Sequence, residues 1–168
     1  MMPFSSYIAK AREIKDPQGT PVDEGILELV AALHMHGFRT GGSCEGHMEH
    51  EGYSYPFVTL VTPEPEGYDY AKFCEDENHH PDLHEEWLHA NLEQQEILTR
   101  LLQDFYKTHK PKSLRCLLVL NSFGPGICNL RSFGAELMMM NGMYEQELPM
   151  FQAEIQAFKN FLVERTPS

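Results

Sequence analysis

Basic side chains are scarce in this sequence and nowhere form a cluster. The 168 residues include 13 lysines and arginines against 25 aspartates and glutamates, which makes a formal net charge of −12. A field of this sign repels phosphate backbones, so tight nucleic-acid binding would need a local basic patch, which the sequence lacks. We therefore expect no nucleic-acid partner and interpret the acidic excess as a solvated surface.

Long apolar runs and closely spaced cysteine pairs are also missing. No segment approaches the roughly 18 consecutive apolar residues of a membrane helix, and the opening MMPFSSYIAK lacks the apolar run of a signal peptide. The four cysteines are scattered and form no CxxC pair. These features predict reduced thiols, a cytoplasmic location and no membrane partner.

The length and the spacing of apolar residues predict one α/β domain of the α+β kind over residues 1–168. Residues 1–20 form an N-terminal arm in this interpretation, and residues 63–81 a polar connection rich in His and Glu. Three main helices are expected: one from the Thr20-Pro21 cap to Gly37, one over 82–109, and a last one over Leu148 to Leu162. Asp23 is expected to stabilise the first of these helices through its dipole.

Four strands are expected between these helices, in the overall order α-β-β-α-β-β-α. They cover residues 38–43, 55–62, 114–120 and 127–133. The third strand is apolar almost throughout, which predicts a central position covered on both faces. Pro56 suits a sheet edge or the start of a strand. One mixed or antiparallel sheet, with helices mostly on one face, would bury the apolar stripes.

The stretch FRTGGSCEGHMEH, residues 38–50, carries most of the reactive side chains. Gly41 and Gly42 remove side chains just before the strand ends, so a ligand or another backbone can approach closely. Gly46 can adopt the positive φ of a tight turn, and such a turn exposes backbone N–H groups that bind anions. Ser43 and Gly46 are therefore candidate ligand-binding residues.

Three chemistries fit this stretch. Cys44, His47 and His50 offer a thiolate and two imidazoles, which suit zinc, with Glu49, Glu51 or a distant residue as the fourth ligand. Alternatively, His47 activates Cys44 as a nucleophile, although the neighbouring glutamates oppose thiolate formation. A third option uses Glu45 and His47 as acid and base beside an inert Cys44. Taken singly, each of these residues is more often a packed thiol or a solvated loop side chain.

Other candidate residues lie farther along the chain. Asn129 and Arg131 share one face of a strand, and Arg131 suits bidentate binding of an anionic group if that face borders the Cys44 turn; the alternative is a surface salt bridge. The histidines of NHHPDLHEEWLHAN, residues 78–91, are interpreted as a solvated helix start, with completion of the Cys44 site as the alternative. The methionine-rich AELMMMNGM, residues 135–143, is interpreted as a core contact or a homodimer contact.

The helix end ALHMHGFRT, the SCEGH turn and the strand YPFVTL resemble a family of small bacterial and phage proteins of unknown function, whose hallmark is the Ser-Cys-Glu-Gly-His turn. A later hairpin of that family carries an Arg-containing strand, which CNLRSFGAE matches, so the resemblance spans most of residues 22–136. It implies no particular reaction. The turn is also similar to the Ser-Cys-Ser-Gly-Arg turn of wybutosine-forming tRNA methyltransferases, but Glu45 replaces the second Ser and His47 the Arg.

The sequence thus predicts a small cytoplasmic protein with a ligand-binding or catalytic site at Ser43–His47. Cys44, Glu45 and His47 are the candidate catalytic residues. The expected ligand is small and polar or anionic, and the expected cofactor, if one is bound, is zinc. The alternative is a non-enzymatic acidic interaction or inhibitor protein, for example a phage-encoded one. A purely structural zinc is a third possibility, in which removal of the metal unfolds the chain.

Overall fold

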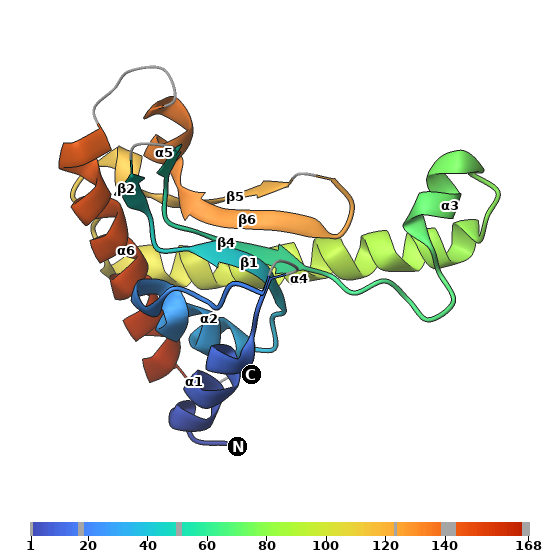
Figure 1. Ribbon diagram of the computed structural model, residues 1–168, viewed down its shortest axis with the longest axis horizontal. Coiled ribbons are helices and arrows are strands. Elements are labelled where there is room, and N and C mark those ends of the chain that lie inside the picture. The colour runs from blue at the N-terminus through green and yellow to red at the C-terminus, as the bar shows by residue number, and fades with distance from the viewer. Residues whose placement is uncertain (1, 17–18, 50–51, 123, 139–143, 166–168) are drawn as a thin grey trace.

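The computed structural model describes residues 2–16, 19–49, 52–122, 124–138 and 144–165. This part of the chain forms six α-helices, one short 3-10 helix and a four-stranded antiparallel sheet (Figure 1). A separate two-stranded hairpin follows the first strand of that sheet. The helices are α1 (Phe4–Glu13), α2 (Glu24–Met35), α3 (Tyr70–Glu75), α4 (Pro81–Thr108), α5 (Phe133–Met138) and α6 (Tyr144–Glu164).

The sheet confirms the predicted α+β class and the antiparallel alternative for its strands. Its order is β1-β4-β6-β5, formed by β1 (Thr40–Cys44), β4 (Phe57–Val61), β6 (Ile127–Ser132) and β5 (Leu118–Ser122). The hairpin consists of β2 (His47–Glu49) and β3 (Gly52–Ser54), and it inserts between β1 and β4 in the chain. The turn between β1 and β2 is therefore the point where the chain leaves the sheet.

One face of the sheet is covered by α2, α4 and α6, as their apolar spacing predicts. Val58, Leu60 and Leu130 point from the central strands into this layer and are fully buried. They meet apolar side chains from α2, α4 and α6, among them Leu29, Leu33, Leu98, Phe105, Ile155 and Phe158. The alternate residues of the same strands lie on the other face and are half-buried, except Ile127, which is exposed.

The N-terminal half of α4 extends beyond the sheet and, with α3, forms an arm (Figure 1). We define the arm as residues 63–96. Trp87 fastens it to the body, because its indole N–H donates a 2.8 Å hydrogen bond to the carbonyl of Thr62. His84 lies inside the arm, stacked on Phe73 at 3.8 Å between ring centroids and hydrogen-bonded through Nδ1 to the hydroxyl of Tyr68.

Several sequence expectations differ from the structure. Strand β5 is an edge strand rather than a central one, because it pairs with β6 alone at the end of the sheet order. It is also shorter than predicted, since Leu114–Cys116 forms the 3-10 helix. Asp23, not Thr20, is the N-cap residue of α2. The N-terminal segment 1–20 contains helix α1, whose Ala11 is buried against α2. The sequence did not predict this helix.

Other expectations agree with the structure. Pro56 precedes the first residue of β4, so the strand-start alternative is correct. Gly37 adopts a φ of +86° just after α2, where a left-handed residue ends the helix. Within the described residues, no helix combines the length and the apolar character needed to cross a membrane.

Candidate functional site

The predicted site lies on the turn between β1 and β2, and Gly46 determines the shape of that turn. Its φ is +82°, a conformation that side chains disfavour. A Cβ atom there would lie 2.7 Å from Leu148 Cδ1 and 2.7 Å from Pro56 Cδ, so packing also requires glycine. The Gly46 N–H points back and donates a 3.3 Å hydrogen bond to the Sγ of Cys44. Gly46 thus holds the thiol in place, and its predicted role in ligand binding stays a prediction.

Glu45 makes two hydrogen bonds at the start of α2, one to Gly25 and one to Asp23. The Glu45 carboxylate accepts a 2.6 Å bond from the N–H of Gly25, in the first turn of the helix. The N–H of Glu45 donates a 3.1 Å bond to Oδ2 of Asp23. A carboxylate at this end of a helix is stabilised by the helix dipole. These contacts let Glu45 position the turn, and its predicted catalytic role stays a prediction.

Helix α6 fastens the turn from the other side. The side-chain amide of Gln152 donates to the carbonyls of Glu45, at 3.0 Å, and of Gly46, at 3.3 Å. The amide of Gln156 donates to the carbonyl of Gly25 at 2.7 Å. The turn is therefore held by backbone and side-chain contacts to α2 and α6. Such fixed surroundings reduce the freedom of the side chains that the turn presents.

Asp23, Cys44 and His47 converge on one side of this turn. One potential ligand atom from each lies within 4.8 Å of those of the other two. Cys44 Sγ is 3.5 Å from Nδ1 of His47, with the thiol buried and the imidazole exposed. Among the residues that the structure describes, no other three His, Cys, Asp or Glu side chains come together in this way. The predicted Cys44–His47 pair is thus joined by an acid from the start of α2.

A cavity of about 330 Å³ adjoins the three side chains. One wall is β1, where Gly42 and Ser43 lie, and the opposite wall is the segment that leads from α1 to α2, including Lys15 and Val22. A Cβ atom on Gly42 would meet no atom closer than 3.9 Å, so this glycine leaves the cavity open at that point. Gly41 is needed for packing instead, because a Cβ there would lie 2.7 Å from Val61.

The sheet register brings Arg131 and Asn129 to the same face as Cys44. Cys44 pairs with Phe57, and Phe57 pairs with Arg131, so the three side chains form one row across β1, β4 and β6. Two strand spacings separate Cys44 from Arg131, which is about 10 Å. Phe57 lines the cavity, and Arg131 lies one strand beyond it. Asn129 lies in the neighbouring row, and its Oδ1 has no hydrogen-bond partner among the described residues.

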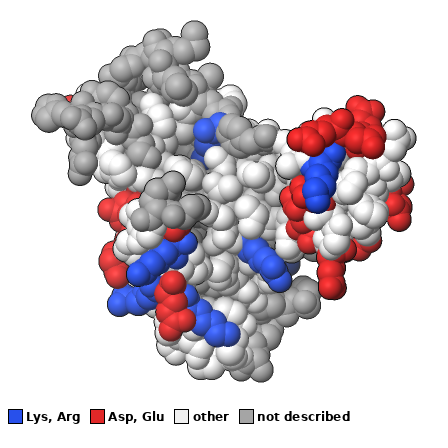
Figure 2. Space-filling model, turned by 45° about the vertical axis from the view of Figure 1, so that its right-hand side comes forward, with Lys and Arg blue, Asp and Glu red and all other residues white. Residues whose placement is uncertain are grey.

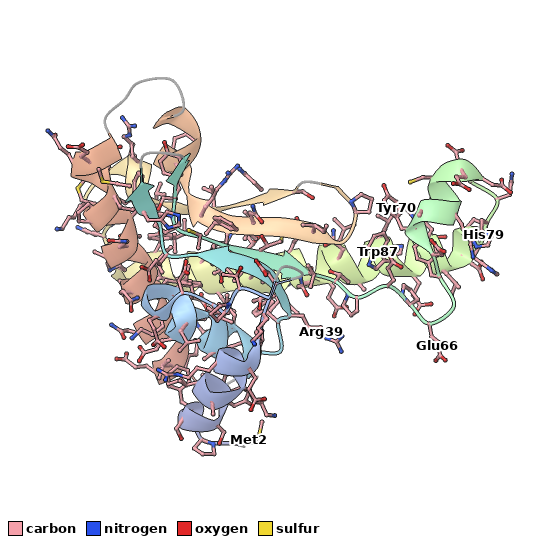
Figure 3. All side chains as sticks on the ribbon, in the orientation of Figure 1. Met2, Arg39, Glu66, Tyr70, His79 and Trp87 are labelled. Carbon is pink, nitrogen blue, oxygen red and sulfur yellow. The ribbon has the colours of Figure 1, made fainter. Side chains whose placement is uncertain are left out.

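The remaining candidates are not brought to the site or are not described. His50 and Glu51 lie outside the described residues, and so does the side chain of Glu49. Most of the methionine-rich stretch 135–143 also lies outside them, so its predicted contact stays a prediction. The histidines of the arm are distant from the turn: His79 lies at the far end of the arm (Figure 3). None of these histidines lines the cavity beside Cys44.

Burial in the core shifts the pKa of two titratable side chains near the site, His34 and Cys128. Burial lowers the pKa of His34, whose Nε2 lies 2.9 Å from the Thr40 hydroxyl at the start of β1. Burial raises the pKa of the Cys128 thiol on β6, so this thiol stays protonated and serves in packing. Neither group faces the cavity beside Cys44.

Asp23 is the site residue that the sequence did not reveal. Asp23 directly precedes α2, so its presence there is equally well explained by a favourable interaction with the dipole of that helix. In addition, 21 positions separate Asp23 from Cys44 in the sequence. The only available signal was its position as an acid directly preceding that helix. Comparison of the chain with family models, curated proteins and solved structures finds no match.

Proposed function

We propose that the protein binds a small polar or anionic ligand in the cavity beside the Ser43–His47 turn and acts on it through Cys44 and His47. The observation that carries this proposal is the convergence of Asp23, Cys44 and His47 on one wall of a cavity. Thiol, imidazole and carboxylate are groups with different chemical abilities, and enzymes collect them at the site where bonds are made or broken. A purely structural turn needs none of them in contact.

The cavity supports a small ligand. Its volume of about 330 Å³ is at the lower end of the range for small-molecule sites. Ser43 and Thr40 are among its lining residues, and Lys15 adds a cationic one. A ligand held there lies over Phe57, and a longer ligand with an anionic end reaches Arg131 one strand farther on.

The two reactive side chains have distinct roles in this proposal. His47 is exposed and accepts or donates a proton at the cavity. Cys44 is held by the Gly46 N–H, a hydrogen bond that favours the thiolate over the thiol. Glu45 faces α2 and positions the turn without touching the ligand.

A thermal-shift screen of small polar and anionic metabolites, followed by calorimetric titration of the hits, tests this proposal. Cys44→Ala and His47→Ala are expected to lower the affinity for a hit at least about tenfold, equivalent to 1.4 kcal/mol. Cys74→Ala and His89→Ala are matched controls, because both side chains are exposed and lie on the arm. Affinity that survives in both site variants contradicts the proposal.

The arm supports a second candidate function, binding of a basic partner by a non-enzymatic protein. Residues 63–96 carry eleven acidic side chains and one lysine, a net charge of −10 out of the total of −12, which leaves −2 for the rest of the chain. Figure 2 shows the acidic side chains gathered over the projecting lobe. A field concentrated in this way accelerates association with a positively charged surface.

Charge reversal separates this second function from the first. Glu75→Lys, Glu77→Lys and Asp82→Lys together are expected to abolish binding to an immobilised arginine-rich peptide at physiological salt. The matched control reverses three exposed acids of the body, Glu13, Glu145 and Glu164. Equal loss in both triple variants would mean that only the total charge matters, and the arm would then have no special role.

A further inference from the structure

The spacing of the Cys44 and His47 side chains matches the edge of a zinc coordination tetrahedron. Sγ and Nδ1 lie 3.5 Å apart. Zinc bound at about 2.3 Å from sulfur and about 2.0 Å from nitrogen, in tetrahedral geometry, places those two ligand atoms about 3.5 Å from each other. A carboxylate oxygen of Asp23 lies within 4.8 Å of both, so a small rotation of its side chain completes a third ligand position.

The kinds of donor atom also select the metal. A thiolate and an imidazole are soft or intermediate ligands, which favour zinc over magnesium and calcium. A dication neutralises the two negative charges that Asp23 and the Cys44 thiolate bring into contact. The Gly46 N–H, 3.3 Å from Sγ, further stabilises the thiolate form that binds metal.

The groups around these three side chains resemble the outer shell of a metal site. Asp23 accepts a 3.1 Å hydrogen bond from the N–H of Glu45, which restricts its carboxylate. Glu45 is itself held by Gly25, and its carbonyl accepts from Gln152. Hydrogen bonds of this kind orient metal ligands before the ion arrives and strengthen binding.

We infer that Asp23, Cys44 and His47 bind one zinc ion and leave its fourth position open to the cavity. Three protein ligands with one open position are the pattern of a catalytic zinc rather than a structural one. The open position lies where His47 is exposed and the cavity begins. Asp23 is thus the third ligand among the described residues, and the predicted ligand His50 lies outside them.

The inference rests on the proposed function in one respect: the zinc is catalytic only if the cavity binds a substrate. A zinc-bound water is a nucleophile at neutral pH, which attacks a carbonyl, amidine or phosphoryl centre. The substrate class is then a small molecule with one hydrolysable bond, whose electrophilic atom reaches the open position. Water adds to that atom, the leaving group departs with a proton, and no redox partner is needed.

Elemental analysis of protein purified without a histidine tag tests the inference. The wild type is expected to contain about one zinc per chain, whereas Asp23→Asn, Cys44→Ser and His47→Gln are each expected to lose at least about tenfold in zinc affinity. These replacements keep the size of the side chains, and Asp23→Asn keeps an acceptor for the Glu45 N–H. Cys74→Ser and His89→Gln are the matched controls and should retain the metal.

Cobalt substitution provides a second measurement that does not depend on activity. Co²⁺ added to metal-free wild type is expected to give a thiolate-to-metal charge-transfer band that is absent in Cys44→Ser. Circular dichroism of each variant shows whether it is folded, and Co²⁺ titration is read only on folded variants. Absence of both zinc and the cobalt band in folded wild type overturns the inference, as does zinc content that none of the three substitutions changes.

The outcomes distinguish this inference from the proposed function. If metal-free wild type binds a ligand that Cys44→Ala no longer binds, the proposed function holds and zinc is excluded from it. If the three residues bind zinc but no ligand binds in the cavity, the metal site is confirmed and the proposed function is wrong. If chelation unfolds the chain, the zinc is structural, and the open catalytic position is wrong.

Discussion

Gly46 lies between the thiol and the imidazole of the candidate site, and Gly46→Ala is expected to destabilise the protein through two separable effects. The first is conformational: a φ of +82° costs a residue with a Cβ about 1–2 kcal/mol. The second is steric, because the new Cβ would lie 2.7 Å from both Leu148 Cδ1 and Pro56 Cδ. Overpacking of this kind typically costs about 1–3 kcal/mol. The free energy of unfolding should therefore fall by about 2–5 kcal/mol.

Gly37→Ala is the matched control. Gly37 has a nearly identical φ of +86°, but a Cβ there would meet no atom within 4 Å. Only the conformational cost of about 1–2 kcal/mol applies to this variant. The difference between the two variants, about 1–3 kcal/mol, measures the steric contact at the turn.

Urea unfolding followed by circular dichroism measures both free energies, with the slope of the transition compared to confirm that each variant unfolds in the same way. Equal destabilisation by the two substitutions would refute the packing of the turn against Leu148 and Pro56. Since that packing fixes the direction of the Gly46 N–H toward Cys44, the same result would weaken the site geometry.

Three further outcomes follow from individual contacts. Glu45→Gln is expected to lower the free energy of unfolding by about 0.3–1 kcal/mol, the value of a charge at a helix N-terminus, while ligand affinity stays within twofold of wild type; a tenfold loss of affinity would return Glu45 to the catalytic residues. His34→Gln should reduce the loss of folding stability that the wild type shows as pH falls below 6.5. The pKa of His34 is lowered in the folded state, so below that pH the unfolded chain takes up a proton at His34 and the folded chain does not. Parallel curves of stability against pH for variant and wild type would contradict this. Trp87→Phe leaves the Thr62 carbonyl without its donor and should cost about 1–3 kcal/mol in urea unfolding, and a smaller loss would mean that the arm is held by its apolar contacts alone.

Much of the fold was predictable because the signals are local. Helices α2, α4 and α6 have apolar residues at helical spacing, and their burial on one face of the sheet agrees with that spacing. The position of β5 was not predictable in the same way. Its apolar run is equally consistent with a central strand and with an edge strand whose outer side borders α4, and the pairing partner decides between them.

Some features of the candidate site are likewise local in the sequence, and others depend on tertiary contacts. The SCEGH turn was recognisable because glycines, a thiol and an imidazole are adjacent in the chain, so their proximity needs no tertiary contact. The role of Glu45 depends on whether α2 begins beside it, since its carboxylate binds the first turn of that helix. Arg131 shares a row with Cys44 only because β4 pairs with both of their strands in a particular register.

The sequence by itself determined the three main helices and the chemistry of the turn, because periodicity and local spacing are properties of neighbouring residues. Only the tertiary structure decided that Asp23 meets Cys44 and His47. Any of several acids before or after the turn was an equal candidate from spacing alone. The choice between them came from packing α2 against β1 and α6, a balance of long-range contacts that no short stretch of the chain contains.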